Sequence, residues 1–174
     1  KTLIEGLDAD FGVVLEPTDL LVDTVAKGLA WYVLTIRGES CHASRPHVGK
    51  NPVAALLSLD DDVRAYQDDI ASRTHPLIGS SLCTPTMTDA GVKENVVPDR
   101  AELRFDRRFL PDEDVTEIDA EMDRLAEPLR AEGFEVSVER TRTYEAAEIP
   151  VDAEIAQTVR RHAGEVAGVD TAPH

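Results

Sequence analysis

The sequence has little of what marks membrane-spanning or secreted proteins. Aromatic residues make up 5% of its 174 residues, and no apolar run is long enough to cross a bilayer. Its two cysteines, Cys41 and Cys83, are too few for a disulfide framework, and its first residues do not form a secretory signal. We therefore expect a soluble, cytoplasmic chain, long enough for one domain or for one domain with pieces of another.

Basic residues are also scarce. The chain has 18 lysines and arginines against 34 acidic residues, which gives a formal net charge of −16. Such a surface repels nucleic acids and anionic membranes. The acidic residues are scattered along the sequence, so they indicate a solvated surface, as in a salt-rich or halophilic cytoplasm, rather than a face for a cationic partner.

Residues 26–144 carry the patterns of an α+β domain with the element order βαββαβ. Strands are expected at residues 30–37, 82–88 and 100–109 and from residue 134 onward. One helix should begin at Pro52 with Asn51 as its N-cap, and another should begin at Pro111 and end at Gly133. This order predicts a ferredoxin-like fold, with a four-stranded antiparallel sheet and two helices on one face.

The two ends of the chain show patterns of a different kind. Residues 11–15 form a short apolar run that predicts a buried strand, and a helix is expected from Asp152 to Val166. We interpret residues 1–25 and 145–174 as the two flanks of an α/β domain into which residues 26–144 are inserted.

Glu16 follows the apolar run and precedes Pro17. A carboxylate at a strand end would suit a metal ion, and an ordinary exposed turn residue is the alternative. Asp8 and Asp10 could be surface residues as easily as metal ligands.

His42 lies in the most distinctive stretch of the sequence, residues 38–52, which joins a strand to a helix through small and turn-forming residues. An imidazole there can donate a hydrogen bond to a developing negative charge, or it can simply cap the loop. Cys41 and His47 have weaker claims, because a lone cysteine beside a histidine makes no zinc site.

Asn95 and the pair Arg107 and Arg108 complete the candidates. An amide and a guanidinium together can hold a substrate carboxylate. A turn asparagine and arginines paired with nearby acids explain the same residues.

Four landmarks in order, Glu16-Pro17-Thr18, residues 38–51 with His42, Asn95-Val96-Val97-Pro98 and Asp106-Arg107-Arg108, resemble those of one enzyme family. It is the acetylornithine deacetylase and succinyl-diaminopimelate desuccinylase family of zinc metallohydrolases, relatives of glutamate carboxypeptidases and aminoacylases. In that family a ferredoxin-like lid that forms homodimers interrupts a catalytic domain with two metal ions.

The resemblance implies a role for each landmark. Glu16 would be a metal ligand, and His42 would stabilise the oxyanion in the active site of the partner subunit. Asn95 and Arg108 would bind the substrate's carboxylate, with Arg108 preferred over Arg107 because the family pattern is Asp-x-Arg. The implied reaction is hydrolysis of an N-acyl amino acid or small peptide by a metal-activated water, with two zinc ions, or cobalt or manganese, in the intact enzyme.

The resemblance also implies that the other metal ligands and the general base lie outside these 174 residues, so the chain alone is expected to be inactive. Two alternatives stand beside this interpretation. One is a free-standing ferredoxin-like module that binds a small molecule or regulates a partner. The other is a relative that has lost its metal site and keeps a binding role.

Overall fold

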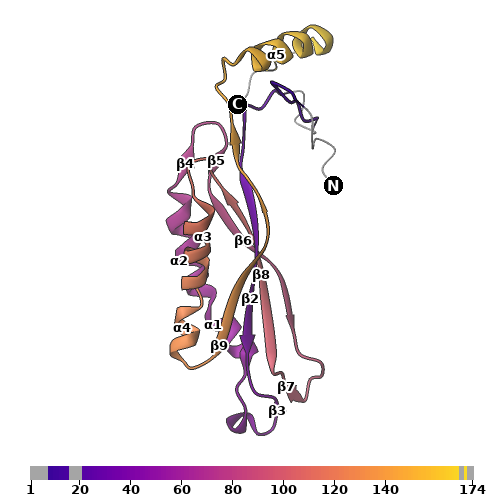
Figure 1. The fold of residues 1–174 in the computed structure, drawn as a ribbon. Helices are drawn as coiled ribbons and strands as arrows, with labels where there is room; N and C mark the ends of the chain where they lie inside the picture. Colours follow the sequence, from indigo (N-terminus) through magenta and orange to yellow (C-terminus); the bar gives the residue numbers. More distant parts are fainter. Residues whose placement is uncertain (1–7, 16–20, 169–170, 172–174) are drawn as a thin grey trace. The chain divides into compact units, whose positions relative to one another are not determined.

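The computed structural model describes residues 8–15, 21–168 and 171 of the chain. Within it the chain divides into two compact units, one formed by residues 26–147 and the other by the segments on either side, up to Val25 and from Glu148. Figure 1 shows the path of the chain through both units.

A four-stranded antiparallel sheet forms the centre of the 26–147 unit. Its strand order is β6-β8-β2-β9, and every neighbouring pair is antiparallel. The strands are β2 (Gly28–Arg37), β6 (Leu82–Ala90), β8 (Arg100–Phe109) and β9 (Glu135–Tyr144). The predicted α+β fold with a four-stranded antiparallel sheet is thus confirmed.

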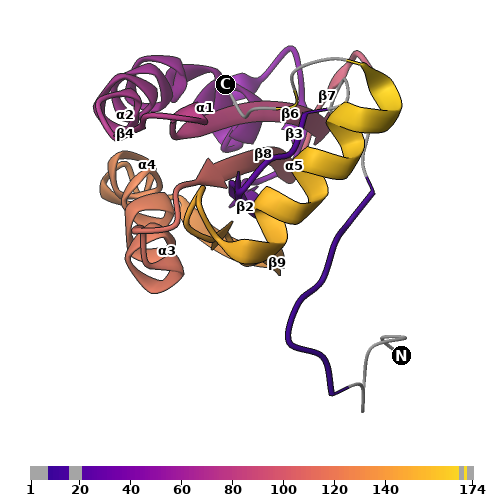
Figure 2. The same cartoon turned by 90° about the horizontal axis from the view of Figure 1, so that it is seen from above.

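Four helices lie on one side of this sheet, as Figure 2 shows. They are α1 (Pro52–Ser58), α2 (Asp60–Ala71), α3 (Val115–Arg124) and α4 (Glu127–Ala131). Each of the two expected helices is therefore interrupted. Between α3 and α4, Pro128 has no N–H to donate, and a proline ring clashes with the carbonyl four residues earlier, which is that of Arg124. Between α1 and α2, Leu59 donates its N–H to Leu56 O at 3.3 Å, a tighter 3₁₀-type turn.

Local signals determine where these helices begin and end. Asn51 caps α1, because its side chain accepts from Val53 N at 3.0 Å. Asp114 caps α3 in the same way, so this helix begins a few residues after the expected start at Pro111. Gly133 has a φ of 84° and closes the segment after α4, as its position in the sequence predicts.

The core lies between the sheet and the helices. Alternate residues of β2 face it, and Tyr32, Leu34 and Ile36 are almost fully buried. They pack with buried side chains from β8 and from the helices, which include Phe105, Phe109, Leu59, Ile70, Ile118, Met122 and Leu129. Because only one face of the sheet is covered in this way, the opposite face keeps exposed side chains such as Trp31 and Tyr144.

Short elements complete the structure. A small antiparallel pair links α2 to β6, and another joins the loops after β2 and β6. These elements are β3 (Cys41–His42), β7 (Val96–Val97), β4 (Thr74–His75), β5 (Gly79–Ser80), the 3₁₀ helix η1 (Pro46–Val48), β1 (Val25–Ala26) and β10 (Ala147–Glu148). The last two pair with each other.

In the flanking unit, α5 (Glu154–Ala167) forms where a helix was expected, and it ends at Gly168 with a φ of 70°. The expected buried strand at residues 11–15 is wrong: these residues form no strand and are exposed, with Leu15 92% exposed. An apolar run becomes a strand only when another strand pairs with it, and in the described part of the chain none does. That same part contains no helix that is both long enough and apolar enough to span a membrane.

Candidate functional site

The pairing of β3 with β7 brings two of the predicted site residues together. His42 lies opposite Val96 in this pair, and Ala43 N donates to Asn95 O at 2.9 Å. His42 and Asn95, which are 53 positions apart in the sequence, are therefore held side by side by the backbone. Figure 1 shows β3 and β7 next to each other at one end of the 26–147 unit.

The loop that carries His42 is closed by close backbone contacts. Gly38 N donates to Asp99 O at 2.8 Å, and Glu39 pairs with Lys50. A Cβ added at Gly49 would lie 2.5 Å from Cys41 Sγ, so only glycine fits there. Arg45 N donates to His42 O at 2.8 Å and closes a tight turn directly after the histidine.

The imidazole of His42 is exposed, and one of its ring nitrogens is engaged by its own loop. Nδ1 lies 2.8 Å from Ser44 Oγ, and the backbone N–H of Ser44 donates to the same Nδ1 at 3.2 Å. Nε2 lies on the other side of the ring. The structure therefore presents a histidine with one fixed edge and one edge available to a ligand.

Arg108 lies on the open face of the sheet, away from His42. It stands near the end of β8, opposite Leu29 of β2, whereas β7 adjoins the other end of β8. The eight residue-to-residue steps from Arg100 to Arg108 span about 27 Å of extended strand. Within one chain, the structure does not bring Arg108 to the pair formed by His42 and Asn95.

The surroundings of Arg108 form a small polar and aromatic surface. Its Nε donates to Asp106 Oδ1 at 2.6 Å, and its side chain remains 45% exposed. Trp31 Nε1 donates to Asp106 Oδ2 at 3.1 Å, and the Arg142 guanidinium lies 5.1 Å from the centre of the Trp31 ring. Asp106 thus links Trp31 to Arg108 across two strands.

Arg107 points to the opposite side of the sheet and is fully buried under the helices. Its Nη2 lies 2.6 Å from Glu113 Oε1, and its Nε donates to Tyr66 Oη at 3.0 Å. A guanidinium enclosed in this way has no access to a substrate, which favours Arg108 over Arg107 as a ligand-binding residue. The alternation of β8 carries this signal, since Arg107 has the same parity as the buried Leu103 and Phe105.

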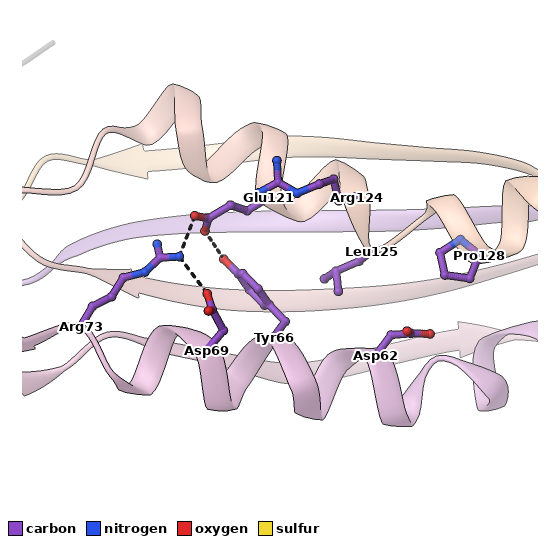
Figure 3. A pocket seen from close by; sticks show the side chains of 8 residues that line it. All are labelled: Asp62, Tyr66, Asp69, Arg73, Glu121, Arg124, Leu125 and Pro128. Carbon is purple, nitrogen blue, oxygen red and sulfur yellow. Dashed lines mark hydrogen bonds and ion pairs between the residues drawn. The ribbon is translucent and has the colours of Figure 1, made fainter.

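A groove between α2 and α3, with a volume of about 250 Å³, is lined by none of the predicted site residues. Figure 3 shows its lining side chains: Asp62, Tyr66, Asp69, Arg73, Glu121, Arg124, Leu125 and Pro128. Arg73 Nη2 lies 2.8 Å from Glu121 Oε1 and 3.1 Å from Asp69 Oδ2, while Tyr66 Oη donates to Glu121 Oε2 at 2.9 Å. Hydrogen bonding to Glu121 raises the pKa of Arg73, and burial raises the pKa of Tyr66. These four side chains are therefore engaged with one another, and their contacts join α2 to α3.

The metal site implied by the family resemblance is not formed by the residues that the structure describes. Glu16 lies outside the described residues. Among residues 8–15, 21–168 and 171, no three His, Cys, Asp or Glu side chains come together in a group that could hold a metal ion. The two cysteines are both free thiols, and burial raises the pKa of Cys83 to about 12, so it is no nucleophile.

The fold defines an α+β domain whose four-stranded sheet has one covered and one open face. The chain belongs to the family of M20 peptidase dimerisation domains, whose family model matches residues 24–133. The relatives and structures that it resembles include metallohydrolases, which are larger proteins.

A succinyl-diaminopimelate desuccinylase from Corynebacterium glutamicum is 27% identical over 135 residues, which cover 74% of this chain and 34% of that protein. A metallohydrolase from Methanocaldococcus jannaschii is 34% identical over 107 residues, 62% of this chain and 30% of that protein. The structure of an M20 family metallo-carboxypeptidase from Sulfolobus solfataricus superimposes with a TM-score of 0.70 at 16% identity, over 93% of this chain and 55% of that one. The chain thus spans about a third of the length of the curated relatives it matches.

Proposed function

We propose that this chain is the dimerisation and lid portion of a metal-dependent hydrolase that cleaves the amide bond of N-acyl amino acids or small peptides. The observation that carries the proposal is the exposed His42, fixed beside Asn95 by the β3 and β7 pair inside the part of the chain that matches the family. The names of the relatives, a desuccinylase and a carboxypeptidase, support amide hydrolysis as the reaction class.

In this proposal His42 acts on the partner subunit. It donates a hydrogen bond to the carbonyl oxygen of the scissile amide as that oxygen gains negative charge in the tetrahedral intermediate. Asn95 and Arg108 bind the substrate's carboxylate, with Asn95 from the subunit that supplies His42 and Arg108 from the other subunit, because the two residues lie far apart within one chain. Asp106 engages Nε and Nη2 of Arg108, so the remaining N–H groups of the guanidinium are available to a second carboxylate.

A second copy of the chain is the proposed partner, and the contact surface is the edge of the sheet at β6 together with α1. In the described structure β6 is an edge strand, and all of its residues except Cys83 are exposed. On α1, Leu57 is 70% exposed. Unpaired strand edges and exposed apolar side chains are commonly buried when two protein chains associate. Because α2 begins with Asp60, Asp61 and Asp62, this contact should strengthen as salt screens the repulsion.

Sedimentation velocity at low and high salt tests the dimer. The wild-type chain should sediment as a dimer at high salt, and Leu57→Glu should sediment as a monomer. The matched control is Val92→Glu, which places the same charge at a 91% exposed position in the loop after β6. A monomeric wild type at every salt concentration, or a Leu57→Glu variant that still dimerises, would contradict the proposed surface.

We also propose that the chain is inactive by itself and that it belongs to the cytoplasm, where free thiols such as Cys41 and Cys83 persist. In support of the inactivity, the described part of the chain holds no group of three metal-binding side chains. An assay of the 174 residues with zinc or cobalt and a panel of N-acyl amino acids should give no turnover above buffer. Clear turnover would refute the division of labour proposed for this chain.

A further inference from the structure

We infer that Ser44 is a positioning residue that holds His42 in the tautomer with the proton on Nε2 and directs that N–H away from the loop. The inference rests on the proposed function for its purpose, since an oxyanion is stabilised by a donor. Its basis, however, is the local geometry of the 42–45 turn.

The argument begins with the backbone N–H of Ser44, which always carries a proton. It donates to His42 Nδ1 at 3.2 Å, so Nδ1 must offer its lone pair. In a neutral imidazole one nitrogen accepts and the other donates, and the proton is therefore on Nε2. The opposite tautomer would place two hydrogens against each other between Ser44 N and Nδ1.

The hydroxyl of Ser44 adds a second contact to the same nitrogen, with Oγ 2.8 Å from Nδ1. This hydroxyl can donate to Nδ1 in the Nε2–H tautomer or accept from Nδ1–H in the other, so it does not choose between them. Its contact instead holds Nδ1 beside the backbone N–H of Ser44, which can only donate and therefore selects the Nε2–H form. The two contacts also fix the orientation of the ring, because a half turn about the bond from Cβ would replace Nδ1 with a carbon. An exposed side chain that would otherwise sample several rotamers is thus held in one.

The backbone around His42 keeps this arrangement in place. Arg45 N donates to His42 O at 2.8 Å on one side, and Ala43 N donates to Asn95 O at 2.9 Å on the other. Because Ser44 engages Nδ1, this nitrogen faces the loop, and the nitrogen on the far side of the ring is a donor. A histidine that has to donate to an external oxygen gains from being set in this form before the ligand arrives.

Long-range ¹H–¹⁵N NMR of the labelled 174-residue chain at about pH 9, where histidine side chains are neutral, measures the tautomer directly. His42→Gln identifies the signals of His42. His47, which is exposed in the same loop, is the internal reference. Comparing the tautomer ratio at His42 with that at His47 corrects for the preference that an unconstrained imidazole has on its own. We expect a higher ratio of the Nε2–H form to the Nδ1–H form at His42 than at His47.

Ser44→Ala removes the hydroxyl that holds the ring beside the backbone N–H, so the ring should leave that N–H more often. The ratio at His42 should then fall toward that of His47, by about threefold, as expected for one exposed hydrogen bond. Ser44→Thr keeps a hydroxyl and should retain the wild-type ratio. Circular dichroism verifies that both variants fold. A His42 ratio equal to that of His47, or a Ser44→Ala ratio equal to wild type, would overturn the role of Ser44. The NMR measurement needs no turnover, so its outcome does not depend on the proposed function. If the proposed hydrolase function proved wrong, the measured tautomer of His42 would still stand.

Discussion

Replacing Glu113 by alanine should strongly destabilise the 26–147 unit. The Glu113 side chain is 9% exposed and accepts from four donors. They are Leu110 N at 2.7 Å, Arg107 Nη2 at 2.6 Å, Arg73 Nη1 at 3.0 Å and the hydroxyl of Ser81. Its loss leaves the fully buried Arg107 without its main carboxylate partner.

The magnitude follows from that burial. Breaking a buried ion pair by removing one partner costs about 3–5 kcal/mol. Arg107 keeps its bond to Tyr66, so we expect the lower end, about 3 kcal/mol in the free energy of unfolding. At about 3 °C for each kcal/mol, the melting temperature should fall by about 10 °C. Glu113→Gln, which keeps a neutral acceptor, should cost about half as much.

Thermal and urea unfolding followed by circular dichroism provide the measurement. Glu117→Ala, an exposed carboxylate at the start of α3, is the matched control and should change stability by less than about 0.5 kcal/mol. A double-mutant cycle with Arg107→Met should show coupling of at least about 1.5 kcal/mol, because the two side chains are in direct contact. A Glu113→Ala variant as stable as the control would refute the assignment of this network as a stabilising element.

Three further results are expected. Burial disfavours the charged form of Glu113, but the hydrogen bonds from Ser81, Leu110 N–H and Arg107 outweigh it, so the pKa of Glu113 is lowered. The stabilisation from the Glu113 carboxylate is therefore present above its unfolded-state pKa of about 4.3 and is lost as the pH falls through its folded-state pKa. Urea unfolding between pH 5 and 3 should show this loss of stability, and in Glu113→Gln the free energy of unfolding should depend less on pH. The same pH dependence in Glu113→Gln as in the wild type would argue against the role of Glu113. At pH 8 a thiol reagent should leave Cys83 unmodified in the folded chain, because burial raises its pKa to about 12, and should modify it in urea; equal rates would contradict its burial. In a full-length protein carrying this chain, His42→Ala should lower kcat about 10²- to 10³-fold with little change in KM; loss of the same size in the control His47→Ala would point to damage of the loop instead.

The fold could be predicted from the sequence where apolar residues repeat clearly with the two-residue period of a strand or with the period of a helix. The strand at residues 100–109 was predicted with its observed ends, because alternation and flanking turns both indicate them. The break at Pro128 was missed, although a proline that follows several helical residues predicts one. The run at residues 11–15 predicts a strand that the structure does not contain, since an apolar run carries no information about whether another strand is present to pair with it.

The candidate site was predictable only in part, for a similar reason. The small and turn-forming residues around His42 indicate an exposed, functional loop, but not that Asn95 is its neighbour. That contact depends on a pairing between segments more than fifty residues apart. Strand alternation alone predicts that Arg107 and Arg108 lie on opposite faces of the sheet. The partners of Arg107 come from α2 and from the loop before α3, and no local sequence pattern specifies them.

The open face of the sheet supplies its own optical probe. Trp31 is the only tryptophan in the sequence, its indole N–H is bonded to Asp106, and Asp106 is also the carboxylate that holds Arg108. A ligand carboxylate that binds the remaining N–H groups of Arg108 would change the electrostatic field at the indole. The intrinsic fluorescence of the unmodified chain should therefore report binding at Arg108, without any label and without catalysis.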